Sequence, residues 1–184
     1  RQERRWGDAL PAAERAGELD QRSSEAHRNL ALAIGHLGRA EDALVEARNA
    51  VELEPSSVWA HQALGTILRS QGRLDEAIAA FRKALEIDAR FPPAHYNAGI
   101  ALDQQGKKDE AIAAYRSAIE LDPRDDGAHN NLGVVLRGQG KLEEAVAEYR
   151  KAIELNPTNV YAHNNLGLVL HDQSGRFTPE AQAV

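Results

Sequence analysis

The stretch DGAHNNLGVVLRGQGKLEEAVAEYRKAIELNPTN, residues 126–159, decides the fold because imperfect copies of it follow one another along the chain. Equivalent residues of successive copies are always the same number of positions apart, as Gly99 and Gly133 are. Small residues, histidines and prolines occupy equivalent places in successive copies. The columns are Gly65, Gly99, Gly133 and Gly167; Ala43, Ala77, Ala111 and Ala145; Ala50, Ala84, Ala118 and Ala152; His27, His61, His95, His129 and His163; and Pro55, Pro123 and Pro157, with Ala89 in the gap. Self-similarity at one period indicates a protein built from stacked copies of a single supersecondary unit.

Each unit predicts two helices. Residues 128–137 carry apolar side chains three and four positions apart, which marks one face of a helix. Gly138 and Gly140 then break the pattern, because glycine is costly within a helix and well suited to a turn. A second helical pattern starts at Leu142 and ends before Pro157, which disfavours the helical conformation for the residue preceding it. Since one such hairpin cannot bury its own apolar faces, the copies must stack into an all-α solenoid of antiparallel helix pairs.

The unit resembles the tetratricopeptide repeat (TPR) over about residues 24–173. The family's unit is about 34 residues long, which agrees with the step between the columns. The matching positions are small, apolar, aromatic or proline sites: Leu132, Gly133, Ala145, Tyr149, Ala152 and Pro157, with Phe81 and Tyr115 repeating the aromatic. The histidine column is a departure, because this family often has tryptophan there. The resemblance implies a right-handed superhelix of TPR units that binds proteins and almost never carries chemistry of its own. In character the array is most similar to those of O-linked N-acetylglucosamine transferases and of bacterial TPR scaffold proteins.

The chain is predicted to form a single TPR array over residues 1–184. Its parts are a half-repeat helix (1–23), four complete repeats (24–57, 58–91, 92–125 and 126–159) and a partial repeat (160–184). In the partial repeat we expect the first helix to end before Ser174-Gly175 and a second helix to start at Thr178. Leu166, Val169 and Leu170 then lack a complete second helix to cover them. We therefore expect either that the natural protein is longer or that another chain covers this face.

Composition excludes several classes of partner. A net charge of −6, a pI near 5.7 and the lack of a dense lysine and arginine cluster argue against nucleic acid. No apolar run is long enough to span a membrane and no signal-peptide pattern is present, so we expect no membrane insertion and a cytoplasmic location. The chain has no cysteine, which excludes disulfides and thiol catalysis.

The histidine column is the candidate metal site to weigh. Adjacent helices pack roughly 8–10 Å apart, whereas histidines that share a zinc ion must each approach it to about 2.0–2.1 Å. One histidine per layer cannot converge on an ion, so we expect each ring to pack between the helices of its own hairpin. Carboxylate pairs such as Glu143-Glu144 recur at the start of the second helices, where they complement the helix dipole. We predict no catalytic residue, no metal, no cofactor and no enzymatic activity.

The inner face of the first helices is the predicted binding surface, since TPR arrays commonly use it as a concave groove. A row of asparagines runs along it, and an amide side chain offers both a donor and an acceptor to any peptide backbone. This row looks like the asparagine ladder of the O-linked N-acetylglucosamine transferases. Aromatic side chains supply apolar anchors. The predicted peptide-binding residues are Asn29, Asn97, Asn131, Asn165, Asn130, Asn164, Trp59, Tyr96, Tyr161, Arg69, Asp103 and Arg137. In the alternative interpretation the asparagines bond within and between helices, and the aromatic rings are packing residues.

Three functional hypotheses follow from these features. The first is a protein-interaction scaffold that binds a peptide or protein segment in the concave groove. The second is a self-assembling module, a homo-oligomer formed through the incomplete C-terminal repeat, because a head-to-tail contact of this kind produces closed dimers or filaments. The third is the substrate-recruiting arm of a larger enzyme such as a glycosyltransferase. The sequence names no particular partner for any of the three.

Overall fold

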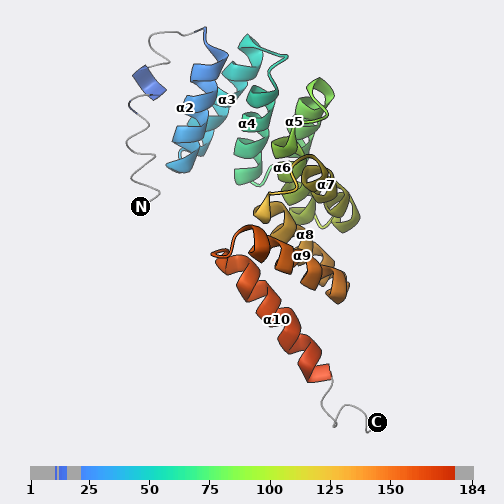
Figure 1. Ribbon diagram of the computed structural model, residues 1–184. Coiled ribbons are helices and arrows are strands. Elements are labelled where there is room, and N and C mark those ends of the chain that lie inside the picture. Colours follow the sequence, from blue (N-terminus) through green and yellow to red (C-terminus); the bar gives the residue numbers. More distant parts are fainter. Residues whose placement is uncertain (1–10, 12, 16–21, 177–184) are drawn as a thin grey trace.

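The computed structural model describes Pro11, residues 13–15 and residues 22–176, with side chains described as far as His171. All regular secondary structure in these residues is helical, and helices of similar length follow one another along the chain, separated by short turns (Figure 1). The helices are α2 (Ser24–His36), α3 (Ala40–Leu53), α4 (Val58–Ser70), α5 (Leu74–Ile87), α6 (Pro92–Gln104), α7 (Lys108–Leu121), α8 (Asp126–Gly138), α9 (Leu142–Leu155) and α10 (Val160–Arg176).

Local chemistry sets the helix ends. Four of the first helices start at a side-chain cap, in which Ser23, Ser57, Asp125 or Asn159 accepts a hydrogen bond from the backbone N–H three residues further on. The turn inside each complete hairpin contains a glycine with positive φ, such as Gly140 at 77°, a conformation that other residues rarely adopt. Each second helix then opens with two acidic residues in its first turn, where negative charge is stabilising.

In three of the hairpins the two helices approach closely because a glycine on the first faces an aromatic ring on the second. A Cβ built on Gly133 would lie 2.6 Å from Cε1 of Tyr149, and the two preceding repeats contain the same pairing. The rings of Phe81, Tyr115 and Tyr149 are at most 2% exposed. These rings and the surrounding alanines and leucines form a hydrophobic core that continues from repeat to repeat.

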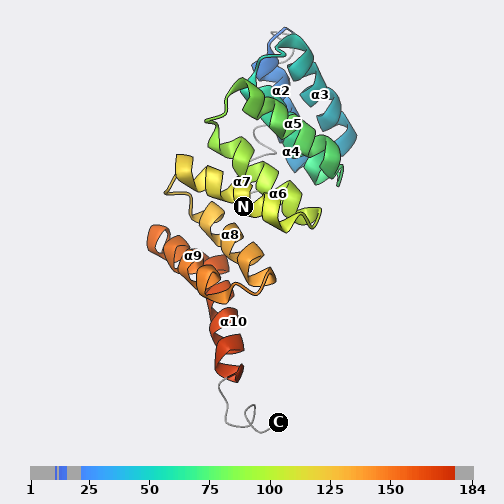
Figure 2. The ribbon, with the colours of Figure 1, turned by 90° about the vertical axis from the view of Figure 1, so that its right-hand side faces the viewer.

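The first helices also contact one another along the array: α2 packs on α4, α4 on α6, α6 on α8, and α8 on α10. Each second helix also packs against the first helix of the following repeat. The stack is curved, with α2, α4 and α6 towards its inner side and α5 and α7 towards its outer side (Figure 1). Figure 2 shows successive hairpins turned relative to one another as the stack descends to α10. The predicted all-α solenoid of antiparallel helix pairs is confirmed.

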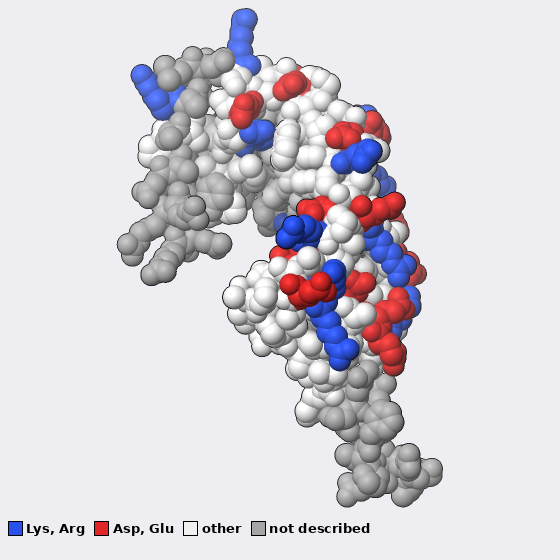
Figure 3. All heavy atoms as spheres, viewed as in Figure 1, with Lys and Arg blue, Asp and Glu red and all other residues white. Residues whose placement is uncertain are grey.

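The outer side carries most of the visible charge. Figure 3 shows lysine, arginine, aspartate and glutamate side chains gathered along this side with both signs interspersed. Two ion pairs link neighbouring second helices there, Arg82 with Glu110 at 3.5 Å and Arg116 with Glu144 at 3.2 Å. Exposed pairs of this kind contribute little to stability.

The C-terminal repeat differs from its prediction. The expected break before Ser174-Gly175 is wrong, because α10 runs without interruption from Val160 to Arg176. Ser174 is the counterpart of Gly140 in the next repeat, at the place where each complete repeat has a glycine with φ between 73° and 78°. Serine rarely adopts that conformation, so the turn is not made and the helix continues. The expectation that Val169 lacks cover is also wrong, because Val169 is 0% exposed, whereas Leu170 is 42% exposed. The helix predicted to start at Thr178 and most of the helix predicted within residues 1–23 lie outside the described residues; Pro11 and residues 13–15 are helical.

The histidine column joins consecutive repeats as well as the helices of one hairpin. Nε2 of each of the last four histidines lies 2.9–3.4 Å from the carbonyl oxygen six residues earlier, in the turn that enters the repeat. Because a carbonyl oxygen only accepts, Nε2 is the donor. Within the hairpin, Nδ1 of His129 lies 2.6 Å from Glu148 Oε2, and His27 pairs with Glu46 in the same way. The predicted packing within the hairpin is thus present at these two positions, and the bond to the preceding turn was not predicted.

Candidate binding groove

The inner surface is built from stripes of side chains on the first helices. On α4, Trp59, Gln62, Thr66 and Arg69 follow one another at intervals of three or four residues, which places them on one side of the helix. Side chains of α2 face this stripe. The two helices therefore enclose a trough at the N-terminal end of the array.

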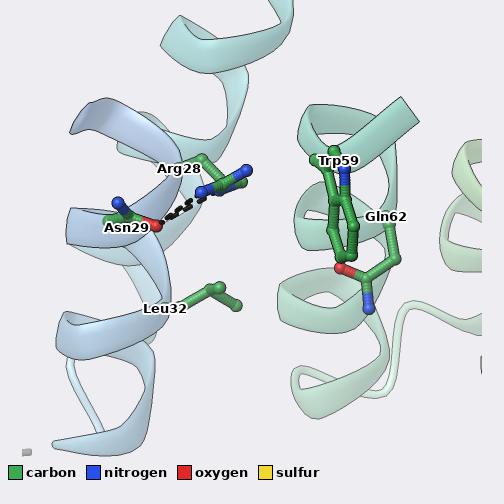
Figure 4. Close-up of a pocket in the computed structure, with 5 residues that line it drawn as sticks. All are labelled: Arg28, Asn29, Leu32, Trp59 and Gln62. Atoms are coloured by element: carbon green, nitrogen blue, oxygen red, sulfur yellow. Dashed lines mark hydrogen bonds between the residues drawn. The ribbon is translucent and has the colours of Figure 1, made fainter. Parts of the chain in front are cut away.

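The upper part of the trough is a cleft of about 360 Å³ lined by Arg28, Asn29, Leu32, Trp59 and Gln62. Figure 4 shows Arg28 and Leu32 of α2 directed towards α4, with the Trp59 ring across the open space. An apolar floor with amide and guanidinium groups around it is suited to holding an apolar side chain next to a polar backbone.

Trp59 is held in an exposed position. Its ring is 51% exposed and contacts the ring of Phe91 edge-on, with centroids 4.6 Å apart and an interplanar angle of 83°. Phe91 is itself only 8% exposed, so the indole rests against a buried ring. The guanidinium carbon of Arg28 lies 5.8 Å from the Trp59 ring centroid, within the range of a cation–π interaction. The indole thus keeps an apolar surface open to a ligand.

A second cleft of about 150 Å³ continues the trough towards the C-terminal end of α4, and Leu32 lines both clefts. Its other lining residues are Gly35, His36, Thr66, Ile67, Arg69 and Ser70. Arg69 is partly buried, and its Nε has almost no accessible surface and no hydrogen-bond partner.

Tyr96 of α6 lies in the middle of the inner surface. Its hydroxyl accepts a hydrogen bond from Asn131 Nδ2 of α8 at 3.1 Å, and its ring contacts Tyr115 with centroids 6.1 Å apart. Burial raises the pKa of Tyr96, and the nearby Asp125 carboxylate adds to the effect. Tyr96 therefore remains a neutral phenol at physiological pH and links two repeats.

The asparagine row is partly engaged in bonds within the protein. Asn97 donates to the Pro93 carbonyl at 2.8 Å, Asn165 donates to Asn130 Oδ1 at 3.0 Å, and Asn29 accepts from Arg28. Asn130 is 8% exposed and also donates to Asn131, so it supports its neighbours. An amide nitrogen carries two hydrogens. Asn97, Asn131 and Asn165 each use one of these hydrogens in the bonds that the structure shows. Each therefore has a second donor hydrogen for a ligand.

The remaining predicted site residues lie further along the array. Tyr161 on α10 is 76% exposed, and Asn164 on the same helix is also exposed. Asp103 of α6 forms an ion pair with Lys108. Arg137 of α8 is partly buried. Burial raises the pKa of Tyr149, and the charge of Arg137 partly offsets that rise.

Reasoning from the sequence missed two structural contributions. Phe91 was not recognised as a contact of Trp59, although the two rings meet edge-on. A glutamine column at Gln71, Gln105 and Gln139 was not recognised, although it repeats at the same fixed step as the other columns. Its amide nitrogens donate at 2.7 Å to the start of the second helix of the preceding repeat, at Ala40 O, Asp75 Oδ1 and Asp109 Oδ1. These bonds therefore join the end of each of these first helices to the second helix of the preceding repeat.

Two kinds of site are absent from the described residues. No group of three or more histidine, cysteine, aspartate or glutamate side chains there is arranged to hold a metal ion. None of the helices in that part of the chain combines the length and the apolar character needed to cross a lipid bilayer.

The fold and the groove define an α-solenoid of helical hairpins whose first helices form the inner surface. A TPR repeat family model matches residues 65–106, 101–140 and 135–174, and tetratricopeptide repeat models match residues 47–79 and 24–49. The chain therefore belongs to the TPR family, and the predicted resemblance is confirmed.

Solved protein structures share the architecture. TTC0263, a thermophilic TPR protein of Thermus thermophilus, aligns with a TM-score of 0.80 and 25% identity over 91% of each chain. PilF of Pseudomonas aeruginosa aligns with a TM-score of 0.77 and 28% identity over 83% of this chain and 69% of that chain. YrrB, described as a TPR protein with an unusual peptide-binding site, gives a TM-score of 0.69 and 25% identity over 90% of this chain and 86% of that chain. No curated protein sequence matches the chain significantly.

Proposed function

We propose that the protein is a non-catalytic interaction scaffold that holds an extended segment of a partner protein in its inner groove. The observation that carries the proposal is the open cleft between α2 and α4, with a half-exposed tryptophan fixed in its wall. Rigid aromatic anchors of this kind are typical of binding hot spots. The solved relative YrrB, whose own description includes a peptide-binding site, supports the same class of function.

The amide row supports an extended ligand. Inner helices pack roughly 8–10 Å apart and an extended chain advances about 3.3–3.6 Å per residue, so one asparagine meets about every third ligand residue. The free donor hydrogens of Asn97, Asn131 and Asn165 then bond to backbone carbonyls of the ligand. Such bonds do not depend on the ligand's sequence, so specificity must come from the side-chain clefts.

Site-specific photo-crosslinking tests this proposal. A photoreactive amino acid is placed at Asn97 or Asn164 on the inner helices, and at Arg82 or Arg116 on the outer helices as matched controls. After irradiation in a lysate of the source organism, mass spectrometry identifies the crosslinked peptides. We expect the same partner segment to crosslink from both inner positions and from neither outer one. Equal yields from the outer positions, or no crosslink from the inner ones, contradict the proposal.

Self-association is a second candidate, favoured by one observation on α10. Leu170 is 42% exposed, whereas Leu136, at the equivalent position of the preceding repeat, is 1% exposed. A Cβ at Gly167 would meet nothing within 4 Å. An apolar face of this kind is suited to another helix. Sedimentation velocity over a wide concentration range tests the candidate: a dimer that is lost in Leu170→Glu supports it, and a monomer at every concentration excludes it.

A further inference from the structure

Arg69 has a feature that the scaffold function alone does not explain. Among the described residues no hydrogen bond or ion pair joins its guanidinium to another side chain, and its Nε is shielded from solvent without a partner. A charged donor held in this way costs free energy unless a ligand satisfies it. The guanidinium of arginine is well matched to a carboxylate, which accepts two parallel N–H bonds.

The neighbours of Arg69 do not neutralise it. The nearby hydroxyls belong to Tyr96 and Tyr115. Burial raises the pKa of both phenols, so both are uncharged at physiological pH. The Asp103 carboxylate, which also lies near Tyr115, is engaged in an ion pair with Lys108. A negative group at Arg69 must therefore come from a ligand.

The opposite end of the same trough is apolar. Trp59 presents a half-exposed ring, and Leu32 lines the clefts at both ends. Arg28, beside the ring, already binds the carboxylate of Glu25 at 3.0 Å, so it is the less available of the two arginines. The trough thus offers an apolar surface at one end and an unpaired cation at the other.

The length of α4 sets the distance between these two features. Trp59 and Arg69 are ten residues apart on one helix, which corresponds to about 15 Å at about 1.5 Å per residue. An extended peptide covers this distance in about four residues. A ligand that reaches both ends therefore has an apolar residue and an acidic residue about four positions apart.

We propose that the trough between α2 and α4 is a subsite for an acidic peptide segment, which places an apolar side chain on Trp59 and Leu32 and a carboxylate on Arg69. This inference rests on the proposed function and gives it a ligand class. The net charge of −6 repels acidic ligands at long range, so the attraction is local to Arg69. The segment runs along α4 at this point and continues into the amide row.

Selection from a library of random dodecapeptides displayed on phage tests the ligand class, with the full chain as the immobilised target. We expect enriched peptides to contain an apolar residue three to five positions from an aspartate or glutamate. Selection on Arg69→Glu should replace the acidic residue by lysine or arginine. Enrichment without an acidic residue, or the same acidic peptides from Arg69→Glu, overturns the inference.

A double-mutant cycle on the best peptide tests the contact directly. Arg69→Gln in the protein and the change of the acidic residue to its amide in the peptide should each weaken binding about tenfold. The two changes together should weaken it no further, because they remove the same contact. Arg82→Gln on the outer side is the control and should leave affinity unchanged, and the peptide change alone keeps the test valid if Arg69→Gln alters folding. Independent effects of the two changes overturn the inference.

The outcomes separate this inference from the function on which it rests. If the selected peptides no longer bind the double variant Tyr96→Ala/Asn131→Ala but still bind Arg69→Gln, the groove is the binding site and the acidic subsite is excluded. Absence of any enriched peptide, or peptides insensitive to all three changes, excludes both.

Discussion

Replacement of Gly133 by alanine tests the packing rule on which the solenoid depends. The added Cβ would lie 2.6 Å from Cε1 and 2.9 Å from Cδ1 of Tyr149, whereas carbon atoms in favourable contact are about 3.5–4.0 Å apart. The ring is fully buried and cannot move aside without shifting α9. Overpacking of a core typically costs about 1–3 kcal/mol, and the gain in helix propensity from glycine to alanine is at most about 1 kcal/mol. We expect a net loss of about 1–2 kcal/mol.

Gly167→Ala is the matched control. Gly167 occupies the equivalent position of the next repeat, but a Cβ there would meet no atom within 4 Å. Only the propensity gain of up to about 1 kcal/mol remains, so this variant should be slightly stabilised. The two substitutions are chemically identical, so opposite signs assign the difference to the ring of Tyr149.

Thermal and urea unfolding followed by circular dichroism measures both variants. For a chain of this size, about 1 kcal/mol shifts the midpoint by roughly 2–4 °C, so Gly133→Ala should unfold roughly 2–8 °C below the parent. Gly167→Ala should unfold at or slightly above the parent midpoint. A Gly133→Ala protein as stable as the parent, or an equal loss in both variants, would refute the reasoning.

Two further predictions concern buried polar groups. His129→Ala removes the contacts to Glu148 and to the Pro123 carbonyl and should cost about 1–3 kcal/mol. His163→Ala, at an exposed site with only its bond to Pro157 shown, should cost less than about 1 kcal/mol; equal losses in urea unfolding contradict this. Burial raises the pKa of Tyr115. As the pH rises past about 10, the phenol therefore loses its proton in the unfolded chain before it does so in the folded protein. Stability is therefore complete below about pH 10 and falls as pH rises through the folded pKa. Tyr115→Phe should reduce that fall in urea titrations between about pH 9 and 11, and an unchanged pH dependence contradicts the assignment.

The fold was predictable because its determinants are local and repeated. The expected first helix over residues 128–137 became α8, Asp126–Gly138, and the expected restart at Leu142 is the first residue of α9. Helical periodicity and glycine breaks act within one hairpin, and each copy repeats the signal. The prediction was wrong where a copy departs from the pattern, at Ser174. There the sequence places a serine in the position of the turn glycine.

The details of the groove depend on contacts between repeats, which a pattern within one repeat does not contain. The exposure of Trp59 depends on Phe91, which lies at the entry to the next repeat. The row of asparagines was visible in the sequence, but the choice of donor and acceptor partners depends on the distance between helices.

The copies within the chain share some positions that packing fixes and differ at others. The glycines that face buried rings recur because a larger side chain does not fit. By contrast, the position of Trp59 is occupied by Pro93, Gly127 and Tyr161 in the following repeats. The packing between repeats therefore does not demand one residue type there, and Trp59 and Tyr161 are both exposed. On the proposed function, these anchors lie three inner helices apart, roughly 24–30 Å. A bound segment must therefore extend over about eight residues to contact both.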